Sequence, residues 1–89
     1  MVDAGLHQYH VPPDVLEGFP GTEVVAPKTW FAGGKMRKRW RDEEGKIYEW
    51  DYQHGAVERY SSRGIHEGEF DHRTGKMLKG PEEGRKVEV

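Results

Sequence analysis

The sequence KIYEWDYQHGAVERY, at residues 46–60, decides the fold that we expect for this chain. Its first half is rich in Ile, Tyr and Trp, which favour β-strands, and a second β-like run begins at Ala56. His54 and Gly55 separate the two runs, and glycine readily adopts the positive φ that tight hairpin turns require. The stretch therefore predicts a β-hairpin whose turn is centred on His54 and Gly55.

Short β-like runs bounded by turn residues flank this hairpin, a pattern that is typical of an antiparallel meander. They cover residues 35–41, 65–70, 76–79 and 85–89. We therefore expect a mainly β (α+β) fold that contains one twisted antiparallel sheet of about five strands.

Residues 1–34 have no regular hydrophobic period, and prolines and glycines interrupt them throughout. We expect an irregular arm with at most one short helical turn, and with Leu16 and Phe19 packed over the sheet. The chain, residues 1–89, is then one small domain whose β-sheet core, residues 35–89, would carry the chemistry.

The composition excludes several classes of site. The 89 residues contain no cysteine, so the chain has neither disulfides nor thiolate metal ligands. His7 and His10 lie near Asp3, but no third and fourth ligand follow at a usable spacing, so we expect no metal and no other cofactor. No apolar run reaches the length of a signal-peptide core or a membrane span, so we expect no signal peptide and no membrane partner.

The charges are unevenly distributed, although the net charge is only −2. Residues 35–41 hold five cations and no anion, whereas residues 42–58 hold six anions and one cation. If residues 35–41 form one strand, alternation places most of these cations on one face, where they could contact RNA phosphates beside a stacking tryptophan. The residues expected to contact RNA in this way are Lys35, Arg37, Lys38, Arg39 and Trp40. The alternative is a solvated edge strand whose cations prevent aggregation, and composition does not choose between the two.

A turn centred on His54 and Gly55, or a four-residue loop from Gln53 to Ala56 with the same register, would pair Asp51 with Glu58 across the hairpin. Their Cβ atoms would then lie roughly 5 Å apart. Two carboxylates in this position destabilise a sheet, so folding alone would disfavour the pair. Their proximity would also raise one carboxyl pKa towards neutrality, which suits proton transfer.

His54 would project over the same patch, and Asp51 could fix its tautomer. Because no cysteine and no convincing serine nucleophile lies near this group, we considered reactions that need no protein nucleophile. Cleavage of RNA by its own 2′-hydroxyl is one, since it needs only a base, an acid and a cation for the phosphorane. The alternative is an ordinary charged surface on a hairpin.

Four stretches of the chain match a known family. They are KMRKRW, KIYEWDYQHGAVERY, IHEGEFDHRTGKMLKGP and the closing Arg85-Lys86, and the arm with YHVPP and APKTW matches as well. With these motifs the chain resembles the cytotoxic ribonuclease domain of the rRNA-cleaving colicins. Related domains end some contact-dependent inhibition toxins and other polymorphic bacterial toxins. The resemblance covers nearly the whole chain.

The resemblance implies an active site formed by Asp51, His54, Glu58 and Arg85. Glu58 would be the general base on the 2′-hydroxyl, and His54 the acid or a charge stabiliser. Asp51 would orient this pair or share protons with it, and Arg85 would stabilise the phosphorane. Tyr60 and His66 occupy matching positions and would line the site.

The resemblance also implies a substrate and a partner. The family cuts one bond in the decoding centre of bacterial 16S rRNA without a metal, and it leaves a 2′,3′-cyclic phosphate. A small acidic immunity protein of the producing cell holds it inactive. We therefore expect the ribosome and an immunity protein or antitoxin as partners. Action would be in the cytoplasm of the target bacterium, after secretion or after delivery within a larger toxin.

One feature departs from the family, whose domains are usually markedly basic. The net charge of −2 weakens long-range attraction to a ribosome. It leaves open a second kind of function, a catalytically inactive module of the same fold that binds RNA or protein. A small β-domain with only a structural role is the third possibility.

Overall fold

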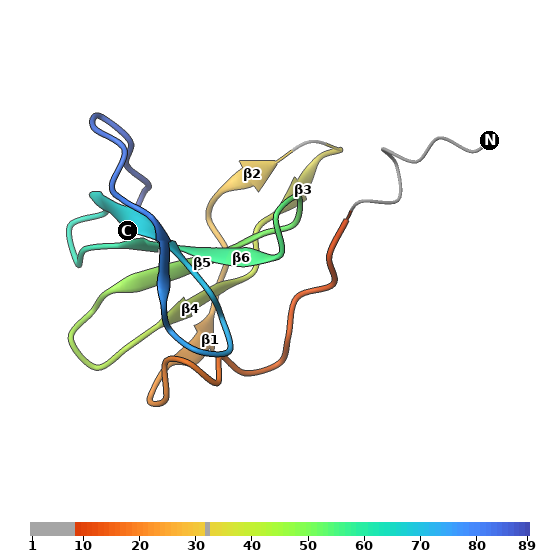
Figure 1. Cartoon of the computed structure of the whole chain (residues 1–89). Coiled ribbons are helices and arrows are strands. Elements are labelled where there is room, and N and C mark those ends of the chain that lie inside the picture. The colour runs from red at the N-terminus through yellow and green to blue at the C-terminus, as the bar shows by residue number, and fades with distance from the viewer. Residues whose placement is uncertain (1–8, 32) are drawn as a thin grey trace.

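The computed structural model describes residues 9–31 and 33–89, and all the regular elements in these ranges are strands (Figure 1). Six of them form one antiparallel sheet, in the order β1-β4-β5-β6-β7-β8. They are β1 (Glu23–Val25), β4 (Arg39–Arg41), β5 (Ile47–Asp51), β6 (Ala56–Tyr60), β7 (His66–Phe70) and β8 (Met77–Lys79). The expected mainly β fold is confirmed. No helix in the described ranges is long and apolar enough to cross a membrane.

Two further strands, β2 (Trp30–Phe31) and β3 (Lys35–Met36), pair only with each other. Residues 35–41 are therefore not one strand, because the chain leaves the β2–β3 hairpin after Met36 and enters the main sheet at Arg39. The predicted alternation of cations along residues 35–41 is wrong for this reason.

Both ends of the chain differ from the prediction. Residues 1–34 supply an edge strand, β1, which pairs with β4, so the described part of the arm is not wholly irregular. Residues 14–17 form a bend and a turn instead of a helical turn. Residues 85–89 make no edge strand and contribute one isolated bridge between Ile65 and Lys86.

The central hairpin has neither predicted turn, because its four-residue loop begins one residue earlier than the alternative at residues 53–56. The loop spans residues 52–55, the Gly55 amide donates to the Asp51 carbonyl at 2.8 Å, and Gly55 has the expected positive φ of 68°. Asp51 pairs with Ala56, and Glu58 pairs with Glu49. Glu58 is then a diagonal neighbour of Asp51, at roughly 7–8 Å, so the predicted Asp51–Glu58 pair is wrong.

The Asp51 side chain explains the observed loop. Its carboxylate accepts the backbone N–H groups of Gln53 at 2.9 Å and of His54 at 3.1 Å. An aspartate that bonds the backbone two and three residues ahead stabilises a turn of its own. The hairpin therefore closes around this carboxylate and not around a two-residue turn.

One face of the sheet carries the hydrophobic core. Its buried members are Leu16, Trp40, Tyr48, Trp50, Val57 and Phe70. As predicted, Leu16 and Phe19 bring the arm over this face, and the Phe19 ring lies 4.8 Å from the Tyr48 ring and 5.7 Å from the Phe70 ring. The arm is also hydrogen-bonded to the core, because the Trp50 indole donates to the His10 carbonyl at 2.8 Å.

The opposite face carries charged side chains, and the C-terminal residues run along it. The His66 amide donates to the Arg85 carbonyl at 3.0 Å, and the Val87 amide donates to the Gly64 carbonyl at 2.9 Å. These bonds bring Arg85 beside strands that precede it by many residues. We call residues 82–89 the C-terminal segment.

Candidate active site

A cavity of about 150 Å³ opens on the charged face. It is lined by Asp51, His54, Glu58, His66, Glu69, Lys79, Gly80, Glu82 and Arg85. The structure thus brings together all four residues that were predicted to be catalytic, together with His66. It does so from β5, β6, β7, the hairpin loop and the C-terminal segment.

A β-bulge in β7 places His66 and Glu69 on the same face. Regular alternation would separate them, because they are three residues apart. In the structure Glu69 pairs with Glu58 and His66 pairs with Tyr60, with Glu67 as the extra residue. Gly68 makes this possible, since its φ is 145° and a Cβ there would lie 2.7 Å from the Lys79 carbonyl oxygen.

Glu58 and His66 form a buried pair in which the tautomer of the histidine is fixed. The Glu82 amide donates to His66 Nδ1 at 2.9 Å, so Nδ1 is an acceptor and the neutral ring carries its proton on Nε2. Nε2 then donates to Glu58 Oε1 at 2.7 Å. His66 therefore holds one carboxylate oxygen of Glu58 in place.

Burial raises the pKa of Glu58 above the ordinary value of a glutamic acid. The hydrogen bond from His66 and the charge of Arg85 oppose this shift, and the adjacent Glu69 carboxylate adds to it. A carboxyl group with a raised pKa is a better base near neutral pH than an ordinary surface glutamate.

Arg85 brings a cation to the same carboxylate. Its Nη1 lies 3.7 Å from Glu58 Oε1 and 3.4 Å from Glu82 Oε1, and the side chain is 32% exposed. Tyr60 lies beneath, with Arg85 over its ring at 5.8 Å and the His66 ring at 5.2 Å. Because Tyr60 is buried, its pKa is raised to about 12, and it supports these two side chains instead of facing a substrate.

His54 stands between two carboxylates. Its Nδ1 lies 2.9 Å from Asp51 Oδ2 and 3.3 Å from Glu69 Oε1, so Nδ1 is the donor and Nε2 is the nitrogen that can exchange a proton with a substrate. Burial acts to raise the pKa of Asp51, but the N–H groups of His54 and Gln53, with the nearby positive charges, lower it overall. Asp51 is therefore ionised near neutral pH and orients the ring.

Asp51, His54 and Glu69 could also hold a metal ion, because their ligand atoms all lie within 4.8 Å of one another. Three protein ligands and a water would satisfy a catalytic zinc site. In the structure the same atoms are already joined by the hydrogen bonds of His54 Nδ1. The expected absence of a metal stays a prediction. Of the histidine pair weighed earlier, His7 lies outside the described residues, as does Asp3.

Arg39 and Trp40 do not face a substrate. Arg39 is 1% exposed, and its Nη2 lies 2.6 Å from Oε2 of the fully buried Glu49. Trp40 is 1% exposed and belongs to the core. The expected phosphate contact at Arg39 and the stacking face at Trp40 are therefore corrected, because β4 is a central strand with both faces covered.

The other predicted RNA contacts are separated from one another. Lys35 is exposed on β3, and Arg37 is half-buried and donates to the Trp50 carbonyl at 3.0 Å. The Lys38 ammonium donates to the Pro13 carbonyl at 2.9 Å and so holds the arm. Among these three residues, Lys35 and Arg37 keep a position from which they could reach RNA.

The sequence did not identify Glu69, Lys79 and Glu82 as lining residues. Glu69 pairs with Glu58 across β6 and β7, and this register depends on the bulge. Glu82 contributes through its backbone N–H, which has no side-chain signature. The GEF and LKGP motifs of the resemblance contain Glu69 and Lys79 and were the available signal.

Comparison with known proteins identifies the family of the chain. The family model described as Cytotoxic matches residues 10–88. The chain belongs to the Cytotoxic family. The predicted resemblance to cytotoxic domains of colicins is thereby confirmed.

Three curated proteins of Escherichia coli illustrate the similarity of this Cytotoxic domain to known toxins. The chain is 45% identical to colicin E3, 43% identical to colicin-E6 and 47% identical to cloacin, each over 86 residues. Each match covers 91% of this chain but only 15–16% of the relative. The chain therefore spans about one sixth of the length of these relatives.

Proposed function

We propose that the chain is a toxin endoribonuclease that cleaves 16S rRNA at the ribosomal decoding site without a metal. The observation that carries the proposal is one cavity in which Glu58, His54 and Arg85 meet, that is, a base, an acid and a cation. Membership of the Cytotoxic family supports the choice of substrate.

The reaction proposed is attack of the 2′-hydroxyl on the adjacent phosphorus, followed by loss of the 5′-oxygen. Glu58 would take the proton from the 2′-hydroxyl, since its raised pKa suits a base near neutrality and His66 fixes its orientation. Arg85, beside Glu58, would stabilise the negative charge of the phosphorane. The products would be a 2′,3′-cyclic phosphate and a free 5′-hydroxyl.

His54 would deliver the proton to the leaving 5′-oxygen from Nε2. Its Nδ1 is held by Asp51 and Glu69, and these two carboxylates stabilise the imidazolium that an acid must be. Each carboxylate would then have a separate role: Glu58 as the base, and Asp51 with Glu69 as the group that orients the acid.

The test is cleavage of intact bacterial ribosomes in the presence of a chelator. The expected result is one short 3′ fragment of the small-subunit rRNA that begins with a free 5′-hydroxyl, while the longer 5′ fragment ends in a 2′,3′-cyclic phosphate. His54→Ala and Glu58→Ala should abolish the fragment, whereas Glu67→Gln, on the far face of β7, should not. A metal-dependent fragment, or full activity in both alanine variants, would show that the assignment is wrong.

A cognate immunity protein or antitoxin is part of this proposal, as is action in the cytoplasm of a target bacterium. Expression in bacteria should be toxic, and a neighbouring gene product should relieve the toxicity. Harmless expression of the wild-type chain at high level would count against the toxin.

The net charge of −2 leaves open a second candidate, a catalytically inactive module of the same fold that binds RNA or protein. It predicts ribosome binding that weakens with salt and no cleavage at any protein concentration. Binding and cleavage measured on one sample separate the two candidates.

A further inference from the structure

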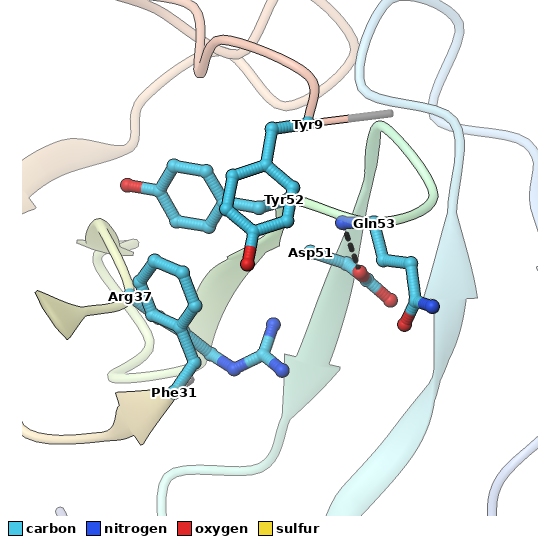
Figure 2. Close-up of a pocket in the computed structure, with 6 residues that line it drawn as sticks. All are labelled: Tyr9, Phe31, Arg37, Asp51, Tyr52 and Gln53. Carbon is cyan, nitrogen blue, oxygen red and sulfur yellow. Dashed lines mark hydrogen bonds between the residues drawn. The ribbon is translucent and has the colours of Figure 1, made fainter. Parts of the chain in front are cut away.

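A second cavity, of about 210 Å³, adjoins the active-site cavity, and Asp51 lines both. Figure 2 shows its lining residues, which are Tyr9, Phe31, Arg37, Asp51, Tyr52 and Gln53. Aromatic rings form one wall, and the polar groups of the other residues face them (Figure 2). We call this space the aromatic cavity. None of the roles proposed above uses its aromatic side chains.

The aromatic wall is built from three separate parts of the chain. The rings of Phe31 and Tyr52 are stacked, with centroids 4.4 Å apart and planes at 13°. The Tyr9 ring is inclined to both, at 6.3 Å from Phe31 and 6.4 Å from Tyr52, and the residue is 55% exposed. Phe31 and Tyr52 are partly exposed and Tyr9 is more than half exposed, so some ring surface stays accessible to solvent.

Hydrogen bonds fix the wall to the catalytic hairpin. The His10 amide donates to the Tyr52 carbonyl at 2.7 Å, and the His10 carbonyl accepts the Trp50 indole N–H at 2.8 Å. The adjacent Tyr9 is thereby held beside the hairpin loop. In the same loop Tyr52 lines the aromatic cavity and His54 lines the active-site cavity. Asp51, which directly precedes the loop, lines both cavities.

The polar side of the cavity offers a cation and an amide. The Arg37 guanidinium lies 5.8 Å from the centre of the Phe31 ring, and its Nη1 donates to the Trp50 carbonyl at 3.0 Å. The remaining N–H groups of Arg37 are suited to a phosphate or a carbonyl oxygen. The exposed Gln53 side chain offers both a donor and an acceptor.

We infer that the aromatic cavity is a subsite for one unstacked nucleobase of the RNA strand, next to the phosphate that is cut. Proteins recognise single-stranded RNA by stacking bases on aromatic rings and bonding their polar edges, and this cavity offers both. It is smaller than the roughly 300–1,000 Å³ of drug-sized sites, which suits a single ring system. The inference rests on the proposed function for the position of the base, because Asp51 joins this cavity to the catalytic one.

A packing role for the rings is the competing explanation, and binding of small probes tests it. Amide resonances of the wild-type chain would be followed during titration with the four nucleoside 5′-monophosphates, and with ribose 5-phosphate as the control without a base. We expect the monophosphates to shift the resonances of Phe31, Tyr52 and Gln53. If ribose 5-phosphate shifts them equally, or if no monophosphate shifts them at high millimolar concentration, the base subsite is refuted.

Kinetics on ribosomes give a second test. Phe31→Leu and Tyr52→Leu keep an apolar side chain but remove the ring, and we expect each to raise KM roughly ten-fold with little change in kcat. Tyr52→Phe should retain the wild-type KM. Trp30→Leu is the matched control, because Trp30 precedes Phe31 on β2, is 66% exposed and does not line the cavity.

The results separate this inference from the proposed function. Base-dependent shifts in a chain that does not cut ribosomes would support the subsite and refute the nuclease. Cleavage with unchanged KM in Phe31→Leu and Tyr52→Leu would refute the subsite and leave the nuclease in place. An equal rise of KM in Trp30→Leu would also refute the subsite, since the effect would not belong to this cavity.

Discussion

The two faces of strands β5, β6 and β7 are built on opposite principles. One face packs Tyr48, Trp50, Val57 and Phe70 into the hydrophobic core. The other places Glu49, Glu58 and Glu69 on neighbouring strands, each directly opposite the next. Like charges opposite each other destabilise a sheet, so the second face is tolerable only because each carboxylate has a partner of its own.

The three carboxylates differ in their partners. Glu49 is neutralised by a buried arginine, Arg39, and takes no part in the cavity. Glu58 is bonded to His66 and lies near Arg85, and Glu69 lies near His54. Two of the three carboxylates thus have partners that can also bind or move protons. The charged face therefore carries the groups proposed to react. Its adjacent carboxylates destabilise the sheet, and the hydrophobic core on the other face must offset this loss of stability.

The Glu58→Gln substitution distinguishes most clearly between a role in catalysis and a role in stability. Loss of a general base should lower the cleavage rate by about 10²–10⁴-fold. The folded-state pKa of Glu58 is raised, so the fold favours its protonated form, and this contribution to stability is lost as the pH rises through that pKa. Denaturant unfolding at pH 7 should therefore give a free energy for Glu58→Gln that is no lower than for the wild type. A large loss of stability would show that this carboxylate supports the fold.

Arg39→Met tests the structural end of the same row of carboxylates. Removing one partner of a buried ion pair should lower the free energy of unfolding by about 3–5 kcal/mol, because Glu49 is left charged and buried. The double variant with Glu49→Leu should recover most of the loss in the same denaturant experiment. If the double variant is no more stable than Arg39→Met, the penalty has another source.

Gly68→Ala tests the β-bulge that places His66 and Glu69 of β7 on the same face of the sheet. A side chain at a φ of 145° is strained, and its Cβ would meet the Lys79 carbonyl, so we expect a loss of about 1–3 kcal/mol. The melting temperature should fall, and activity should fall further because His66 is displaced. Gly80→Ala is the control for stability, since a Cβ at Gly80 would have no neighbour within 4 Å. A wild-type melting temperature for Gly68→Ala would contradict the strain.

The smallest effect is a displacement of the acid limb of the pH–rate profile. Cleavage should fall as the pH drops through the raised pKa of Glu58, because the base becomes protonated. Glu69→Gln removes a charge that raises this pKa, so its limb should move to lower pH. Arg85→Met removes a charge that lowers the pKa, so its limb should move to higher pH, apart from any loss of rate. Profiles of kcat/KM against pH would measure both, and movement in the same direction would refute this account.

The sequence predicted the fold class and the members of the cavity better than their contacts. Residue types and turn signals located the hairpin, and the resemblance added Arg85 from a distant part of the chain. The register was beyond reach, because it depends on whether the Asp51 carboxylate bonds the loop backbone. A shift of two residues kept Asp51 and Glu58 on one face, which is why the grouping survived an incorrect pairing.

The prediction of one cationic strand at residues 35–41 was wrong for a different reason. The alternating cations predict one face of a single strand. In the structure β3 ends at Met36 and β4 begins at Arg39, so Arg37 and Lys38 belong to no strand. The burial of Arg39 follows from Glu49 on the next strand, and no local pattern announces a partner ten residues away. Such a pair becomes visible only when the strands are aligned.

The C-terminal segment described above has a consequence for how long the site persists. Most of its side chains are exposed, and its bonds to β7 and the preceding turn are few, so it should detach from the sheet far more often than the sheet unfolds. Each detachment removes Arg85 from Glu58 and frees Nδ1 of His66, while the core remains intact. The lifetime of the proposed site would then depend on this segment and not on the core, and amide exchange at Glu82 and Val87 would measure it.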